Sequence, residues 1–155
     1  MRRLAPALLL LTMMLTSPAW GAFSDGLAAY DAGDYAAALA AWRPLAEEGD
    51  VRAQVSVAGL YATGLGVRQN LRAAADWYRR AAHRGDAVAQ LNLDDDYATG
   101  RGVTRDPVAA YLWLDLAARQ GRRWAAGRRD EIARTMSAAQ VAEAKRRVAA
   151  WQPRR

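Results

Sequence analysis

The sequence predicts an all-α protein in which helical hairpins stack into an α/α solenoid of about eight helices. The main observation is an internal repeat, because segment 50–85 aligns without gaps on segment 86–121 and 15 of the 36 positions are identical. Repeats of this length are typical of solenoids, in which each unit buries its apolar face against its neighbours. Within each repeat, apolar residues also recur at the three- and four-residue spacing of an amphipathic helix.

The first 21 residues have the pattern of a signal peptide. Two arginines precede an apolar run, residues 4–15, that is shorter than the roughly 20 residues of a membrane-spanning helix. Small residues follow at Ala19 and Gly21, so we expect a signal peptidase to cut after Gly21 or one residue later. The mature protein, residues 22–155, is then one periplasmic or secreted domain without a transmembrane segment. The alternative is that the apolar run stays in the fold as an ordinary helix.

Charge is distributed unevenly along the expected mature protein. Residues 22–118 hold nine basic and thirteen acidic side chains, whereas residues 119–155 hold eleven basic and three acidic ones. A basic tail can mark an anionic partner, although Lys145 is the only lysine and heavy use of arginine also follows from genomic composition. The chain has no cysteine, which excludes disulfides, thiolate nucleophiles and zinc-thiolate sites.

The elements of the domain follow in order, beginning with residues 23–49, which we expect to form an N-terminal capping hairpin. A tight turn at Gly33 separates two alanine-rich segments, and Trp42 and Leu45 of the second segment are placed to face the core. This hairpin would cover the open side of the first repeat, as the terminal units of a solenoid do.

Repeat 1, residues 50–85, and repeat 2, residues 86–121, are each expected to form one hairpin. In repeat 1 the spacing of Ala53, Val57 and Leu60 gathers them on one face of a helix. The sequence therefore predicts a first helix over about 51–63 and a second over about 71–84.

A glycine turn joins the two helices of each repeat. Gly64 and Gly66 can adopt positive φ angles at little cost, and Asn70, or Asp106 in repeat 2, stands where the N-cap of the second helix is expected. A glycine also follows each second helix, where it can adopt the left-handed closing conformation. These glycines are Gly49, Gly85 and Gly121.

The positions that are identical in both repeats form the motif A-Q-x-x-x-x-x-x-Y-A-T-G-x-G-V, followed after five residues by A-A-x-x-W-x-x-x-A-A-x-x-G. This pattern resembles the Sel-1-like repeat, a relative of the tetratricopeptide repeat. The resemblance implies a curved array whose first helices line a concave groove. It also implies a protein-interaction module or adaptor, which in bacteria is often exported.

Residues 122–151 are expected to close the array as a degenerate C-terminal capping hairpin. Residues 122–135 resemble another first helix, and Ser137 and Gln140 form the pattern of a capping box. We expect the last helix over about 138–151, with its basic side chains facing solvent.

Nothing in the sequence indicates catalysis. The only histidine, His83, stands late in a helix among arginines, where a solvated position explains it better than a catalytic triad. The Gly64–Gly66 and Gly100–Gly102 pairs lack the strand and the Lys-Ser/Thr of a phosphate-binding loop. We therefore expect no enzyme, no cofactor and no bound metal.

The run Asp94, Asp95 and Asp96 departs from the repeat, because repeat 1 has Ala58, Gly59 and Leu60 there. Asp96 stands at a position that should face the core, and burying an unpaired carboxylate there costs several kcal/mol of folding free energy. Three explanations stay open. These are a cation site, an ion pair with Arg128 or Arg129 of the third hairpin, and a solvent-facing, distorted or destabilised helix.

The predicted solenoid and its charge distribution indicate two alternative binding surfaces. The first is the concave face, where we expect a protein partner to contact Arg52, Ser56, Gly59, Asn92, Asp95 and Arg123. The alternative is an anionic surface, a lipid or another polyanion, bound by Arg122, Arg128, Arg129, Arg146 and Arg147. Export argues against a nucleic-acid partner, and the oligomeric state does not follow from the sequence.

Overall fold

The computed structural model describes residues 18–153, and within this range the chain is entirely helical and forms eight α-helices. Their bounds are α1 Pro18–Asp31, α2 Tyr35–Glu47, α3 Val51–Thr63, α4 Leu71–His83, α5 Ala87–Thr99, α6 Pro107–Arg119, α7 Arg123–Arg134 and α8 Ala138–Ala150. The predicted helices of the repeats and the last helix agree with these bounds to within one residue. The predicted all-α fold of about eight helices is confirmed.

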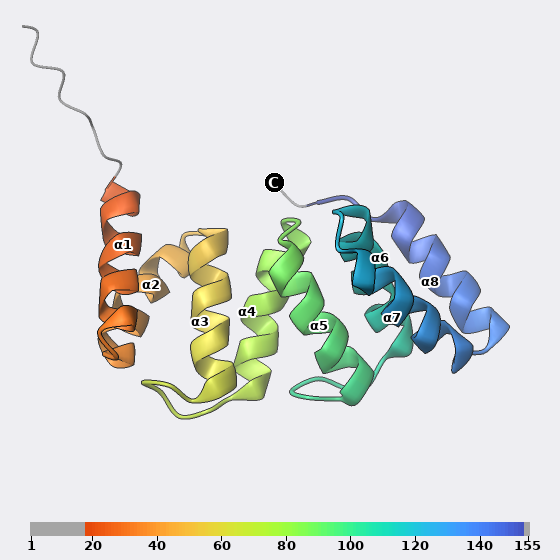
Figure 1. Ribbon diagram of the computed structural model, residues 1–155, viewed down its shortest axis with the longest axis horizontal. Coiled ribbons are helices and arrows are strands. Elements are labelled where there is room, and N and C mark those ends of the chain that lie inside the picture. The colour runs from red at the N-terminus through yellow and green to blue at the C-terminus, as the bar shows by residue number, and fades with distance from the viewer. Residues whose placement is uncertain (1–17, 154–155) are drawn as a thin grey trace, which may run out of the picture.

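The helices follow one another along a row, and each of the first six packs against the next in sequence (Figure 1). We call α1, α3, α5 and α7 the A helices and α2, α4, α6 and α8 the B helices. Every described helix is too short or too polar to cross a membrane. Residues 1–17, most of the expected signal peptide, lie outside the described residues.

The signals that begin and end the repeat helices act as the sequence predicts. The carboxylates of Asp50 and Asp86 accept backbone hydrogen bonds at the starts of α3 and α5. At the ends of these helices Gly64 and Gly100 have φ angles of 77° and 82°, which a residue without Cβ adopts at little cost. Equivalent residues therefore make equivalent bonds in the two repeats.

The second glycine of each turn has a further role that the sequence did not reveal. A Cβ atom on Gly66 would overlap the backbone of Tyr35, and one on Gly102 would overlap the carbonyl of Leu71. Each glycine thus lets the turn of one hairpin touch the first residue of the preceding B helix. This close contact fixes the spacing between consecutive hairpins.

Two polar contacts also recur between hairpins with the period of the repeat. The amide nitrogen of Gln54 donates to the Ala46 carbonyl at 3.0 Å, and Gln90 donates to Ala82 at 3.3 Å. Both glutamine side chains are buried. In addition, arginines of α2 and α4 donate to tyrosine hydroxyls of the next A helix, in the pairs Arg43–Tyr61 and Arg79–Tyr97.

The apolar core runs along the row between the A and B helices. Trp42 and Leu45 are buried against α1 and α3, as predicted, and Trp113 is buried in the central cluster. Trp77 is only partly buried and lies between these two clusters. The tryptophan of repeat 2 is therefore more completely buried than the tryptophan of repeat 1.

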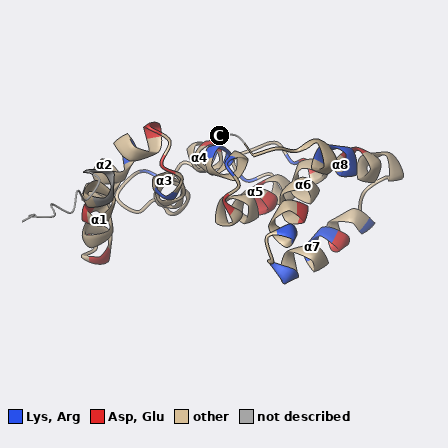
Figure 2. Cartoon of the chain, turned by 90° about the horizontal axis from the view of Figure 1, so that it is seen from above, with Lys and Arg blue, Asp and Glu red and all other residues tan. Residues whose placement is uncertain are grey.

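The C-terminal helices differ from the hairpin we expected over residues 122–151. Helix α8 begins at the predicted capping box of Ser137 and Gln140, but it packs mainly on α6 and not on α7. Figure 2 shows α7 and α8 on opposite sides of α6. The physical reason is that α7 has a single buried side chain, Ala125, whereas Ala144 and Val148 of α8 find an apolar surface on α6.

Candidate functional site

The candidate site lies on the surface formed by the A helices, which we call the A-helix face. The 36-residue period makes Arg52, Val88 and Trp124 equivalent positions at the starts of α3, α5 and α7. Residues four and seven positions further along each helix share the same stripe. The stripe changes character along the row, from an apolar pocket at α1 and α3 to a charged network at α5 and α7.

The apolar pocket, which we call the α1–α3 pocket, has a volume of about 290 Å³. Ser56 and Gly59 line it, so the structure brings together two of the residues predicted for the partner surface. The other lining residues are Leu27, Tyr30, Trp42, Leu60 and Thr63. Sequence reasoning missed Leu27 and Tyr30, which are large side chains left 46% and 39% exposed.

Two glycines make room for this pocket. Gly59 has no side chain to fill it, although a Cβ atom there would only meet the Tyr78 hydroxyl at 3.9 Å. Gly26 in α1 lies directly against the indole of Trp42, which donates a hydrogen bond to the Phe23 carbonyl at 3.1 Å. The floor of the pocket is therefore tightly packed, and most of the pocket lining is apolar.

The charged half of the A-helix face is a network between α5 and α7. The guanidinium of Arg128 contacts Asp94 at 3.1 Å and Asp95 at 2.8 Å, and Arg101 contacts Asp95 at 3.1 Å. One of the three alternatives, an ion pair with the third hairpin, is thus present, but it involves Asp94 and Asp95 and not Asp96. The reason is that Asp94, at 1% exposure, faces α7.

Asp96 is buried at 8% exposure, and its carboxylate has no hydrogen bond or ion pair with any residue in the range 18–153. Burial raises the pKa of the Asp96 carboxyl to about 6, and the more distant Arg101 opposes this shift. Burial likewise raises the pKa of Asp94 to about 6 despite its contact with Arg128. In the described range, no cluster of His, Asp and Glu could hold a metal ion.

The remaining residues predicted for the partner surface are dispersed along the face. Arg52 binds Asp50 at 2.8 Å and lies over the Phe23 ring, and Asn92 donates to the backbone of its own helix. Arg123 is exposed. Extending the repeat period would instead have selected Trp124, which is 55% exposed.

The arginines of the anionic-surface alternative are mostly engaged inside the protein. Arg129 contacts Asp115 and Asp130 at 2.7 and 2.8 Å, and Arg146 and Arg147 contact Glu143 at 2.6 and 2.8 Å. Arg128 belongs to the network described above. Arg122 is exposed and makes no ion pair with the residues described.

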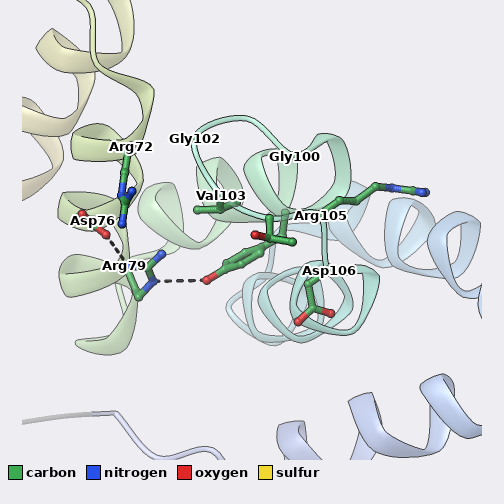
Figure 3. Close-up of a pocket in the computed structure, with 10 residues that line it drawn as sticks. Arg72, Asp76, Arg79, Gly100, Gly102, Val103, Arg105 and Asp106 are labelled. Atoms are coloured by element: carbon green, nitrogen blue, oxygen red, sulfur yellow. Dashed lines mark hydrogen bonds and ion pairs between the residues drawn. The ribbon is translucent and has the colours of Figure 1, made fainter.

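A second, polar groove of about 820 Å³ lies between α4 and the turn after α5 (Figure 3). Arg79 crosses it to bond the Tyr97 hydroxyl at 3.3 Å, and it also holds Asp76 at 2.6 Å. Its charged residues therefore neutralise one another in part. His83 is half-buried with its ring edge-on to Trp113 at 5.2 Å, so the solvated position expected for it is wrong.

Together, the row of hairpins and the contacts that recur with the repeat define an α/α helical-repeat scaffold with one apolar pocket on its A-helix face. The Sel1 repeat family matches residues 51–86 and 87–121, within one residue of the predicted repeats. The chain belongs to the Sel1 repeat family. This family provides helical-repeat scaffolds that bind protein partners and are generally not enzymes.

Two solved structures resemble the chain along most of its length. A Sel1 repeat protein from Oxalobacter formigenes is 32% identical with a TM-score of 0.67, and the match covers 73% of this chain and 88% of that one. A protective antigen present in uropathogenic Escherichia coli strains, with an SLR fold, is 26% identical with a TM-score of 0.77. That match covers 84% of this chain but only 29% of the antigen. No curated protein matches the sequence.

Proposed function

We propose that this protein is an adaptor of the bacterial cell envelope that holds a protein partner on its A-helix face. The observation that carries the proposal is the α1–α3 pocket, where Leu27 and Tyr30 stay exposed beside a helical glycine. An apolar pocket of this kind can receive a large side chain of a partner. Such side chains, buried in well-packed pockets, contribute most of the binding energy at an interface. The groove next to α4 differs from this pocket because charged side chains, among them Arg72, Asp76 and Arg79, form much of its lining.

The proposal is tested by placing a photoreactive amino acid in the full chain at Thr63, on the rim of the pocket, and at Ala40, an exposed position of α2. We expect Thr63 to capture one defined partner in living bacteria and Ala40 to capture none. Gly59→Leu should then abolish the capture, because its side chain would occupy the pocket, and its Cβ atom would meet only the Tyr78 hydroxyl, at 3.9 Å. Ala40→Leu, which adds the same side chain at the exposed position of α2, is the matched control. Equal capture from both positions, or capture that survives Gly59→Leu, would contradict the proposal.

Export is part of the same proposal. Helix α1 begins at Pro18, so cleavage after Gly21 would remove only its first turn. Ala22 and Phe23 would remain, and both pack against the first core cluster. The mass of the protein recovered from the periplasm or the medium should therefore correspond to a chain that begins at Ala22 or Phe23. Recovery of the chain from the cytoplasm with its leader intact would refute export.

A further inference from the structure

Trp124 is the most exposed large apolar side chain of the described residues, at 55%. It lies at the start of α7, one repeat after Val88 and two repeats after Arg52, so it belongs to the A-helix face. In α3 the equivalent arginine covers the ring of Phe23. This indole lies on the same face as the α1–α3 pocket but towards the opposite end of the row. Exposed aromatic side chains of this kind are typical of protein–protein contacts.

The charges around these two places are complementary. Arg122 and Arg123 precede Trp124, and neither makes an ion pair within the described residues. The hairpin of α1 and α2, which forms one side of the pocket, has the opposite balance, with five acidic residues and one basic residue between positions 18 and 49. The apolar pocket therefore suits a large apolar side chain, and the acidic hairpin beside it favours the two arginines that precede that side chain.

The pocket is also large enough for an indole. Its volume of about 290 Å³ is roughly twice the ~150 Å³ of an engineered apolar cavity that binds benzene. Tyr30, Trp42 and Leu60 offer the aromatic and aliphatic surface that an indole would contact.

We propose that the pocket of one copy of this chain receives Trp124 of a second copy, and that the two contacts are made reciprocally in a two-fold symmetric dimer. Two copies can make both contacts at once because the pocket and Trp124 lie on the same face towards opposite ends of the row. Helix α5 then lies near the symmetry axis, where Val88, at 46% exposure, adds apolar surface. This inference rests on the proposed role of the pocket as a protein-binding site.

The test is the mass of the full chain in solution by sedimentation velocity over a range of concentrations. We expect a dimer whose dissociation constant rises at least about tenfold in Trp124→Ala and in Gly59→Leu. Arg123→Glu should weaken the dimer and Arg72→Glu, a charge reversal away from the A-helix face, should not. Raising the salt concentration should also weaken the dimer, because exposed charges are screened.

Mixing separates the reciprocal contact from other modes of association. Trp124→Ala keeps an intact pocket and Gly59→Leu keeps an intact indole, so their mixture should form a one-to-one pair that neither variant forms alone. A monomeric chain, a dimer insensitive to both variants, or a mass that grows beyond two copies would overturn the inference. So would a monomer that floats with anionic lipid vesicles and loses this property in Trp124→Ala. If the chain is monomeric but Gly59→Leu still abolishes capture at Thr63, the proposed function stands and this inference fails.

Discussion

Helices α3 and α5 occupy equivalent places in consecutive repeats, yet they bury different chemistry. At two equivalent buried positions α3 has Ala58 and Leu60, whereas α5 has Asp94 and Asp96. Both helices have the same length, an aspartate at the N-cap and a left-handed glycine at the C-terminal end. The comparison shows that the caps and turns specify the path of the backbone, so that the core positions between them can carry either apolar or charged groups.

The difference depends on the next A helix. Arg128 in α7, which pairs with Asp94, is equivalent to Asn92 in α5. The following hairpin therefore supplies a cation in repeat 2 and none in repeat 1. Substitutions that exchange the chemistry of the two repeats test this explanation.

Leu60→Asp should be the most destabilising change, because it places a carboxylate in the apolar core at a position that is 2% exposed. We expect a loss of about 4 kcal/mol in the free energy of unfolding, measured by urea denaturation at pH 7. Thr63→Asp, one turn later and exposed, is the control and should change stability by less than about 0.5 kcal/mol. A small loss at Leu60 would show that repeat 1 also tolerates buried charge.

Arg128→Ala should destabilise the protein by about 2 to 3 kcal/mol at pH 7, because it leaves the carboxylate of Asp94 buried without a cation. The loss is smaller than for a fully buried pair since 37% of the Arg128 side chain is exposed. The control is Arg123→Ala, which removes an exposed arginine from the same helix. Equal stability of the two variants would mean that the network contributes nothing.

Asp96→Leu restores the residue of repeat 1 and should stabilise the protein by about 2 kcal/mol at pH 7, which a higher melting temperature would show. A clear fall in stability would instead mean that the carboxylate makes a contact that the fold needs. Such a result would reopen the question of a function for Asp96.

The pH dependence of stability follows from the same carboxyl groups. The pKa values of Asp94 and Asp96 rise from 3.8 to about 6 on folding, so the folded state binds these protons more tightly than the unfolded state does. Their contribution is fully present below about pH 4 and is lost as the pH rises through about 6. Asp96→Leu should reduce this slope, which thermal unfolding at several pH values would measure. An unchanged slope would mean that Asp96 does not titrate in this range.

A contact that recurs in both repeats should contribute equally to stability in each repeat. Tyr61→Phe and Tyr97→Phe each remove the acceptor of an arginine from the preceding hairpin. Both should cost about 0.5 to 1 kcal/mol, and urea denaturation can show whether the two losses are equal. A large loss in only one of them would mean that the two contacts are not equivalent.

The helices and turns could be predicted because their signals are local. An aspartate before an apolar stripe or a glycine after it acts on the backbone within a few residues, so Asp50 and Gly64 fix the ends of α3 wherever the hairpin lies. Which helix a side chain faces is not a local property. Hence an ion pair with Arg128 or Arg129 was one of three alternatives for Asp96, whereas the carboxylate that faces α7 and pairs with Arg128 is that of Asp94.

The lining of the α1–α3 pocket was predicted in part for the same reason. Ser56 and Gly59 follow from the helical stripe of repeat 1, but Leu27 and Tyr30 belong to a hairpin that does not align with the repeats. Trp124 was missed by one residue, because Arg122 replaces the N-cap aspartate that marks the start of α3 and α5. Strict extension of the 36-residue period would have found it.

The position of α8 determines where such a chain could grow during evolution. The junction at Gly85 and Asp86 joins two units with the same turn, cap and glutamine contact, so a duplicated repeat inserted there would meet the surfaces that it needs. After Gly121 the situation differs, because α8 already occupies the apolar surface of α6. A new unit at that point would have to displace α8, whereas duplication within the row would leave the terminal helices and the pocket intact.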